Sequence, residues 1–313
     1  MKLGIIGVGA VGAATAMALA LRARVREVVL IDRNRARAKA VATDMHYGVA
    51  LSPMVSIRDG DYDDLADAGL AIVTAGINEK AGGATDRSDP AGRLRLLGTN
   101  VKVFEDIVPK LVKAAPGAAI LVATDPPEPL AAVARQLAGH DRVLSAGTYL
   151  DSLRFRLHLA ERLGVSPGSV EANVVGEHGT SSVFLWSSAR IGGMPLADLL
   201  ARHKIEPEEF RKAVEQDVRF ANITIIEGIG ASQYGIGMVN GRIAEVMLRD
   251  ERAVFPAGSH NQHFGTTLSL PSVIGRQGVA EVLMPEMSEE ETQGLEQSAA
   301  KLRDSLKPFA RAS

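Results

Sequence analysis

The sequence predicts an α/β protein in which a doubly wound parallel sheet is followed by a mixed α+β domain. Over the first half of the chain, short apolar runs alternate with helix-like stretches, the pattern of strands joined by crossover helices. A glycine-rich turn follows the first apolar run, and residues 253–273 alternate apolar and polar side chains as an antiparallel sheet does. We therefore predict two domains, residues 1–147 and residues 148–313.

The composition is that of a globular protein with small-molecule partners. Of the 313 residues, 46% are hydrophobic and 23% are charged, and the formal net charge is -2, so neither disorder nor a nucleic-acid-binding surface is indicated. The chain has no cysteine, which excludes disulfides, thiolate metal sites and cysteine nucleophiles. We see no zinc-binding spacing and expect no metal.

The first 21 residues are largely apolar after Lys2 and could be mistaken for a signal peptide. Gly4, Gly7, Gly9 and Gly12 interrupt this run, which a strand, a turn and a helix explain better. No uninterrupted apolar span reaches the roughly 18 residues that a membrane helix requires. We expect a cytoplasmic protein without a membrane segment.

The first strand, turn and helix form a nucleotide-binding pattern. Residues 2–6 predict a buried strand, residues 7–12 (GVGAVG) a turn, and residues 13–22 an alanine-rich helix. A second strand at residues 25–31 ends at Asp32, about 20 residues beyond the last glycine. A strand before the glycines, a helix after them and an acid at this distance together predict a Rossmann-type dinucleotide site.

The residues of this pattern have distinct physical roles. Gly7 permits the tight turn, Gly9 lets the backbone approach a pyrophosphate, and Gly12 lets the helix pack closely on the sheet. Val11 lies in the same turn, where the helix N-terminus offers free N–H groups to the phosphates. Asp32 would accept hydrogen bonds from the adenosine ribose and repel a 2′-phosphate, so we predict NAD rather than NADP as the cofactor.

The parallel sheet is predicted to continue through four further strands. We expect these strands at residues 55–58, 70–74, 118–123 and 142–145, with helices at residues 35–46 and 98–115. Ligands bind beyond the carboxyl ends of such strands. The residues expected to border the cofactor there are Thr74, Ala75, Gly76, Ala123 and Asp125.

The segment from residue 76 to residue 100 is rich in glycine and charge and cannot pack as a core element. Segments of this kind are commonly lids or binding loops, so we expect a mobile loop here. When it closes, Arg87 and Arg93 could reach a bound anion, whereas Glu79 would disfavour one. A solvated flexible loop is the alternative interpretation of any single charge in it.

Residues 147–182 offer an acid, a base and an anion-binding group. Asp151 and Arg154 are three apart in a helix-like segment, so both can project from one face. His178 follows a short apolar run, residues 172–175, in a Gly-Glu-His-Gly turn. Histidine exchanges protons near neutral pH, aspartate can hold its second ring nitrogen, and arginine matches a carboxylate. The group suits a 2-oxo or 2-hydroxy acid; the alternative is a surface ion pair beside a loop histidine.

The C-terminal part of the chain is predicted to be mixed. Gly228 to Gly235 interrupts a long helical pattern, and Ser232, a small hydroxyl among glycines, could line a pocket wall. Ser288 and Glu291 fit a capping box at the start of the last helix. We expect helices at residues 207–227, 236–248 and 288–306, and strands within residues 253–273 and at residues 279–285.

Taken together, GVGAVG, Asp32, the run from Gly147 to Arg156, and GEHG resemble the NAD-dependent lactate and malate dehydrogenase family over nearly the whole chain. LDSLRFR is similar to the family's LDxxRxR helix, and VVGEHG to its catalytic-histidine strand. The resemblance implies a homodimer or homotetramer.

The resemblance also assigns roles to residues. It implies that His178 is the proton donor and acceptor, Asp151 its partner, and Arg154 the clamp on the substrate carboxylate. Arg93 stands seven residues before Asn100, as in the family's lid, and would polarise the reacting carbonyl, with Asn100 bordering the cofactor. NADH would deliver hydride to the 2-oxo carbon while the histidine protonates the oxygen.

Two departures from the family pattern concern the substrate. Where the family usually reads Ser-Asn-Pro, this chain has Thr124-Asp125-Pro126, so an amide donor is replaced by a carboxyl. An ionised Asp125 would oppose a substrate carboxylate unless it is protonated, screened or aimed at something cationic. Glu79 occupies the position that resembles the family's specificity residue, which is glutamine in lactate enzymes and arginine in malate enzymes.

These departures leave several functions open. We favour reduction of a small 2-oxo acid to the L-2-hydroxy acid, as in an L-lactate dehydrogenase, because no arginine stands at the specificity position. The second hypothesis is a malate dehydrogenase that uses Arg87 for the second carboxylate, since residues 85–89 (TDRSD) resemble a malate-type lid. A third hypothesis is that the substrate carries an amine or lacks a distal acid, which Glu79 and Asp125 would favour. The hypothesis from another class is a catalytically inert nucleotide-binding protein.

Overall fold

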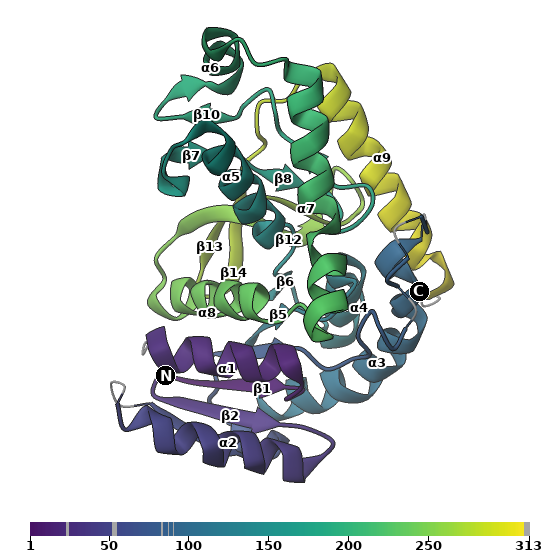
Figure 1. Ribbon diagram of the computed structural model, residues 1–313. Helices are drawn as coiled ribbons and strands as arrows, with labels where there is room; N and C mark the ends of the chain where they lie inside the picture. The colour runs from purple at the N-terminus through teal and green to yellow at the C-terminus, as the bar shows by residue number, and fades with distance from the viewer. Residues whose placement is uncertain (23–24, 52–54, 83, 87, 90, 310–313) are drawn as a thin grey trace.

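A computed structural model describes residues 1–22, 25–51, 55–82, 84–86, 88–89 and 91–309. Its centre is a nine-stranded sheet, ordered β14-β13-β12-β6-β5-β4-β1-β2-β3 (Figure 1). The six strands from β3 to β6 are parallel and run outward in both directions from β1 and β4. This is the doubly wound order that the sequence predicts. The six parallel strands are β1 (Lys2–Ile6), β2 (Glu27–Ile31), β3 (Ser56–Asp59), β4 (Leu70–Val73), β5 (Ala119–Val122) and β6 (Val143–Ser145).

The antiparallel strands of the C-terminal half continue the same sheet. β12 (Ala253–Asn261) pairs with β6 through Gly258 and Ser145, and the chain then returns through β13 (Thr266–Gly275) and β14 (Gly278–Val282). The predicted α/β class is confirmed, and the antiparallel strands extend the parallel sheet instead of standing apart from it. The division after residue 147 stays a prediction, because one sheet crosses it.

Helices cover both faces of the sheet. α1 (Ala10–Arg22), α2 (Arg35–Val49) and α8 (Tyr234–Arg249) pack on one apolar cluster, and α3 (Leu97–Ala114) and α4 (Pro127–Ala138) pack on the other. The strands between them are apolar at nearly every position because both faces are buried. In Figure 1, α1 and α8 lie side by side.

Glycine makes the close contact of α1 and α8 possible. A Cβ on Gly237 would fall 2.8 Å from the Cβ of Ala14, and one on Gly241 would fall 3.0 Å from that of Ala18. The two helices therefore pack nearly backbone to backbone, since no larger side chain fits between them. This packing sets the start of α8 beside the glycine turn that precedes α1.

Other helices of the C-terminal half gather around a separate apolar cluster. An aromatic cluster around Phe155 and Trp186 joins α5 (Tyr149–Leu163), α6 (Leu196–His203) and α7 (Pro207–Ile229). α9 (Glu289–Leu306) covers β13, and its predicted capping box is present between Ser288 and Glu291. The short strands here are β7 (Val170–Glu171), β8 (Val174–Val175), β9 (Val183–Phe184), β10 (Arg190–Ile191) and β11 (Met194–Pro195).

Most predicted elements are present with boundaries shifted by a few residues. The strand predicted at residues 172–175 is only the two residues of β8, and the helix predicted from residue 236 begins at Tyr234. The predicted loop after residue 76 ends in a 3-10 helix, Gly92–Leu96, that leads directly into α3. Within the described ranges, no helix is long and apolar enough to cross a membrane.

Candidate active site

The glycine turn between β1 and α1 has the geometry of a dinucleotide site. Gly7 has a φ of 96°, and a Cβ on it would lie 2.5 Å from the backbone nitrogen of Ala75. A Cβ on Gly12 would lie 2.0 Å from the carbonyl oxygen of Gly7, whereas one on Gly9 would meet no described atom within 4 Å. Glycine is therefore sterically required at positions 7 and 12, and the backbone is open to a ligand at position 9.

Asp32 lies at the same turn. The backbone N–H groups of Val8 and Asn34 donate to its two carboxylate oxygens, at 2.7 Å and 2.8 Å. These bonds fix the carboxylate at the end of β2, where it is only partly buried and keeps lone pairs for a ribose. The open backbone at Gly9, the N-terminus of α1 and this carboxylate fit an NAD molecule.

A cavity of about 280 Å³ extends from the glycine turn to His178. The predicted site residues that line it are Gly9, Val11, Thr74, Gly76, Glu79, Arg93, Ala123, Asp125, Arg154, His178 and Ser232. Other predicted residues do not line it. Asn100 is one of these: it is fully buried, accepts from Ile77 N at 2.8 Å and donates to the Asp125 carbonyl at 2.7 Å. Gly7, Gly12, Asp32, Ala75 and Asp151 are not among the residues that line the cavity. Arg87 lies outside the described residues.

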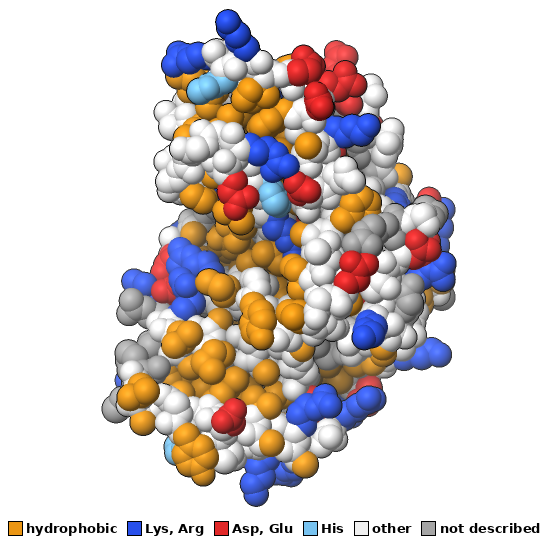
Figure 2. Space-filling view, viewed as in Figure 1, with side chains coloured by type: hydrophobic (Ala, Val, Ile, Leu, Met, Phe, Trp, Pro, Cys, Tyr) orange, Lys and Arg blue, Asp and Glu red, His pale blue; other side chains and the backbone are white. Residues whose placement is uncertain are grey.

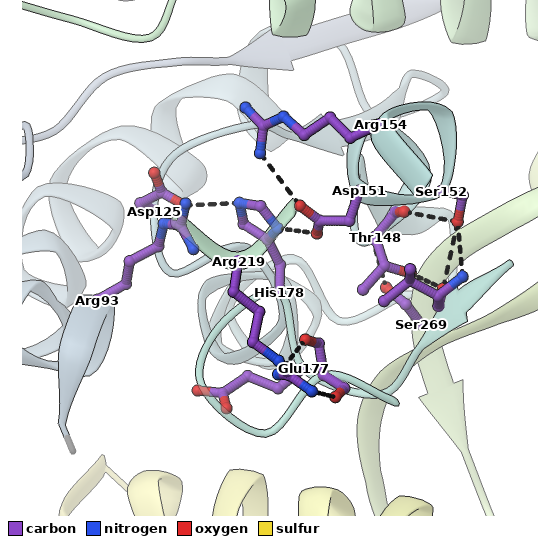
Figure 3. Close-up of polar contacts among 12 residues, drawn as sticks. Arg93, Asp125, Thr148, Asp151, Ser152, Arg154, Glu177, His178, Arg219 and Ser269 are labelled. Atoms are coloured by element: carbon purple, nitrogen blue, oxygen red, sulfur yellow. Dashed lines mark hydrogen bonds and ion pairs between the residues drawn. The ribbon is translucent and has the colours of Figure 1, made fainter. Parts of the chain in front are cut away.

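His178, Asp151 and Arg154 converge as the sequence predicts (Figure 3). The Nδ1 atom of His178 is hydrogen-bonded to Oδ2 of Asp151, and Nη1 of Arg154 donates to the other carboxylate oxygen at 3.2 Å. All three side chains are nearly buried. One carboxylate thus orients both the imidazole and the guanidinium.

Charge sets the protonation of this group. Burial acts to raise the pKa of Asp151, but the positive charges of His178, Arg154 and Arg93 outweigh it and hold that pKa well below its usual range. Burial and Arg93 act to lower the pKa of His178, while Asp151 and Asp125 raise it, and the balance leaves it above its ordinary value. The ion pair favours the protonated imidazole, the form that can donate a proton.

Hydroxyl groups hold the start of α5 against β8. The Thr148 hydroxyl donates to the carbonyl of Val174, and the Ser152 hydroxyl accepts from Val174 N at 2.9 Å. Both side chains are fully buried, so these bonds are protected from water. They fix the helix turn that carries Asp151 relative to the strand that leads to His178.

Asp125 faces two positively charged groups. Its Oδ1 lies 3.5 Å from Nε of Arg93 and 3.9 Å from Nε2 of His178, and Figure 3 marks the contact with the imidazole by a dashed line. The sequence left open whether this carboxyl is protonated, screened or aimed at something cationic; the structure aims it at both cations. Asp125 therefore stands on the side of the imidazole from which a proton would leave.

Glu79 lies at the same end of the cavity. Its Oε1 is 3.8 Å from Nε of Arg93, and its side chain is nearly buried. Burial and the charge of Asp125 raise the pKa of Glu79 to about 7, against the lowering effect of Arg93. Arg93 is thus flanked by two carboxyl groups. Its Nε is buried and makes no hydrogen bond within the described residues, although both carboxyl groups lie at ion-pair distance from it.

Two family models cover almost the whole chain. Residues 1–144 match the lactate/malate dehydrogenase NAD-binding domain, and residues 148–312 match the lactate/malate dehydrogenase alpha/beta C-terminal domain. The chain belongs to the lactate/malate dehydrogenase family. Its cofactor is accordingly NAD, as Asp32 and the glycine turn predict.

Similar dehydrogenases match the chain from end to end. An L-lactate dehydrogenase of Chloroherpeton thalassium is 41% identical and covers 98% of this chain and 99% of its own length. An L-lactate dehydrogenase of Thermus aquaticus is 43% identical, with 97% of each chain covered. The crystal structure of MGS-M5, a lactate dehydrogenase from a Medee basin deep-sea metagenome library, superposes with a TM-score of 0.90 at 31% identity, covering 99% of both chains.

The turn that follows His178 is held closed by the neighbouring residue Glu177. This carboxylate is almost fully buried, accepts from the N–H of Ser181 at 3.0 Å and pairs with Lys301 of α9 at 3.1 Å. Arg219 of α7 donates to the Ser182 hydroxyl at 2.9 Å. The turn is therefore held from two helices.

Some residues that line the cavity or contact His178 were not predicted from the sequence. Arg37 and Asn222 line the cavity, and Glu128 accepts a hydrogen bond from the backbone N–H of His178 at 3.2 Å. Arg37 and Asn222 sit within long helices and carry no local signal. Glu128 follows two prolines at a helix start, where an acid usually faces solvent, yet its side chain is fully buried.

Proposed function

We propose that this chain is an L-lactate dehydrogenase, which reduces a small 2-oxo monocarboxylic acid to the L-2-hydroxy acid with NADH. The observation that carries the proposal is that the Asp151-bound imidazole of His178 and the guanidinium of Arg154 face one cavity, which extends to the glycine turn at Gly9. A proton donor, a carboxylate clamp and a dinucleotide site in one cavity fit this reaction.

The chain's own residues would bind the substrate and move the proton. Arg154 would hold the substrate carboxylate, since it retains donors beyond the single bond it makes to Asp151. His178 would donate a proton from Nε2 to the 2-oxo oxygen, while Asp151 keeps the ring oriented through Nδ1. Arg93, which lines the same cavity, would polarise the same oxygen with its positive charge. NADH, when bound, supplies the hydride.

Glu79 supports a monocarboxylic over a dicarboxylic substrate. Its buried carboxyl lines the cavity within 3.8 Å of Arg93, and together with Asp125 it neutralises the positive charge at that end. A second substrate carboxylate would have to enter beside these two groups, which is electrostatically unfavourable. Lactate-type chemistry is therefore favoured over malate-type chemistry, and the role of Arg87 in a malate enzyme stays a hypothesis.

A steady-state panel tests the proposal. Pyruvate, 2-oxobutyrate, oxaloacetate and 2-oxoglutarate are each assayed with NADH and with NADPH by absorbance at 340 nm. We expect turnover of the monocarboxylic acids with NADH and little with NADPH. Preference for oxaloacetate would favour the malate alternative. Binding of NADH, seen by fluorescence, without consumption of any 2-oxo acid would show a nucleotide-binding protein instead.

Exposed apolar side chains support the expected homo-oligomer. Met17, Leu21, Tyr234 and Met238 are between 47% and 69% exposed on α1 and α8, and apolar atoms gather over these helices in Figure 2. A continuous apolar surface of this kind is typical of an interface. Light scattering on the purified chain measures the assembly directly, and a monomer would contradict it. The cytoplasmic location stays an expectation.

A further inference from the structure

Glu128 lies behind the catalytic histidine, at the junction of three chain segments. It belongs to the first turn of α4, three residues after Asp125, and its side chain is fully buried. One carboxylate oxygen accepts from the backbone N–H of His178 at 3.2 Å, and the other accepts from the Ser269 hydroxyl at 2.7 Å. A buried carboxylate with two donors from different segments ties those segments together.

Ser269 carries the connection on to α5. Its hydroxyl oxygen accepts from the backbone N–H of Thr148 at 3.2 Å, three residues before Asp151. Its backbone pairs with Gly176, two residues before His178, at 2.8 Å and 3.0 Å. A Cβ on Gly147 would lie 2.1 Å from the Ser269 hydroxyl oxygen, so the contact is tight. The chain of bonds from His178 through Glu128 and Ser269 thus ends at the helix that carries Asp151 and Arg154.

We propose that Glu128 is a positioning residue for proton transfer: its carboxylate fixes the peptide of His178 and, through Ser269, the first turn of the helix that carries Asp151 and Arg154. The inference rests on the proposed function. The ionised carboxyl matches the two donors best, because both of its oxygens then act only as acceptors, one for the His178 N–H and one for the Ser269 hydroxyl.

Electrostatics is consistent with this role. Burial raises the pKa of Glu128 to about 7, whereas the positive charge of His178 and the Ser269 hydrogen bond lower it. Because the protonated imidazole stabilises the Glu128 carboxylate, that carboxylate stabilises the protonated imidazole in return. The ionised residue therefore both aligns the proton donor and favours its charged form.

The chain offers a matched control for this network. Ser145 is as fully buried as Ser269 and belongs to the same polar cluster, because a Cβ on Gly258 would meet both the Ser145 hydroxyl and the Glu128 side chain. The Ser145 hydroxyl, however, has no hydrogen-bond partner in the described part of the chain. Both Ser269→Ala and Ser145→Ala thus remove a fully buried hydroxyl. Only the Ser269 hydroxyl belongs to the chain of hydrogen bonds.

The test compares Glu128→Gln, Ser269→Ala and Ser145→Ala with the parent protein. In Glu128→Gln we expect kcat for pyruvate to fall about 10- to 100-fold, the loss that follows small misplacement of a catalytic group. The Kd for NADH should stay unchanged, since the glycine turn is not part of the network. The urea midpoint at pH 8 should not fall, because glutamine buries no charge. Ser269→Ala should lose part of kcat and Ser145→Ala almost none.

Three results would overturn the inference. The first is a kcat of Glu128→Gln within twofold of the parent value. The second is a parallel loss of kcat and urea midpoint in that variant, which would mean a structural role only. The third is equal behaviour of the two serine variants, which would remove the link to α5.

A measurement without turnover separates this inference from the proposed function. The backbone amide proton of His178 donates to a carboxylate, so its NMR resonance should move upfield in Glu128→Gln and stay in place in Ser145→Ala. If the parent protein reduces no 2-oxo acid, the proposed function fails while this shift still reports the contact. An unchanged His178 resonance in Glu128→Gln would refute the contact even in an active enzyme.

Discussion

Oδ1 of Asp125 lies 3.9 Å from Nε2 of His178, on the side of the ring from which the proton would pass to a substrate. The same oxygen is 3.5 Å from Nε of Arg93. A carboxylate in this position competes with the substrate oxygen for both positively charged groups. It also stabilises the protonated imidazole in the absence of substrate, so it acts on binding and on proton transfer in opposite directions.

Replacing this carboxylate by an amide is expected to improve binding and to shift the pH profile. In Asp125→Asn, the KM for pyruvate should fall about tenfold, because one like charge is removed beside the substrate carboxylate. Asp125 contributes to the raised pKa of His178, so that pKa should fall in the variant. Activity in the reducing direction needs protonated His178. As the pH is raised, this activity should therefore begin to decline at a lower pH in the variant than in the parent protein. The pH dependence of kcat/KM measures both effects, and a decline that moves to higher pH would contradict the argument.

Glu79 predicts a pH-dependent KM. Its pKa is raised to about 7, so a second negative charge develops beside Arg93 as the pH rises through that value. We expect the KM for pyruvate to increase between pH 6 and pH 8 in the parent protein and to change less in Glu79→Gln. The same ionisation also lowers the stability of the fold. Because the folded pKa of Glu79 is raised from 4.5 to about 7, its contribution to the free energy of unfolding falls as the pH rises between those two values, so Glu79→Gln should gain stability relative to the parent over that range.

Glu105 is exposed on α3, outside the cavity. Glu105→Gln is therefore the matched control for that experiment, because it removes a carboxylate of the same kind at a distant position. Its KM profile should follow that of the parent protein. A parent KM that is flat across this pH range would show that Glu79 does not ionise near substrate. Equal slopes in both variants would mean that the pH dependence arises elsewhere.

Asp151 is expected to support catalysis and acid stability together. Asp151→Asn leaves a side chain of the same shape but no charge, so the imidazole loses the partner that fixes its tautomer. We expect kcat to fall by up to about 10⁴-fold, the loss that follows when the aspartate of a serine-protease triad is neutralised. The depressed pKa of Asp151 means that its stabilising effect is complete above the ordinary aspartate pKa and is lost as the pH falls below it.

Unfolding curves check the stability part of that prediction. The parent protein should be more stable than Asp151→Asn at pH 7, and the difference should shrink as the pH falls below about 4. NADH affinity is the internal control, because Asp151 is not among the residues that line the cavity. A difference that grows on acidification would contradict the depressed pKa.

Local patterns in the sequence predicted the parts of the site that lie within one segment. The glycine turn, Asp32, and the spacing of Asp151 and Arg154 follow from neighbouring residues, and the structure places them as expected. The convergence of His178 on Asp151 also came from the family resemblance, because 27 residues separate them.

Contacts between residues that are far apart in the sequence could not be predicted from such local patterns. Glu128 meets His178 across 50 positions and Ser269 across 141, and nothing local marks a glutamate between two prolines as buried. Helix α4 itself was missed because prolines stand at its start, where they are tolerated but resemble a turn. The direction of Asp125 likewise depends on Arg93, which arrives from a different segment.

Two alanine substitutions in the glycine turn distinguish a glycine that the fold requires from a glycine that cofactor binding requires. A Cβ at position 12 would lie 2.0 Å from the Gly7 carbonyl, so Gly12→Ala must shift α1 or the turn. We expect it to lower stability by about 1–3 kcal/mol, as overpacking does, and to abolish NADH binding. A Cβ at position 9 meets no described atom within 4 Å, so Gly9→Ala should unfold like the parent protein. It should nevertheless bind NADH weakly, because the methyl group occupies the space that the pyrophosphate would approach. Fluorescence titration and urea unfolding on both variants check this, and a Gly9→Ala protein that binds NADH normally would place the cofactor elsewhere.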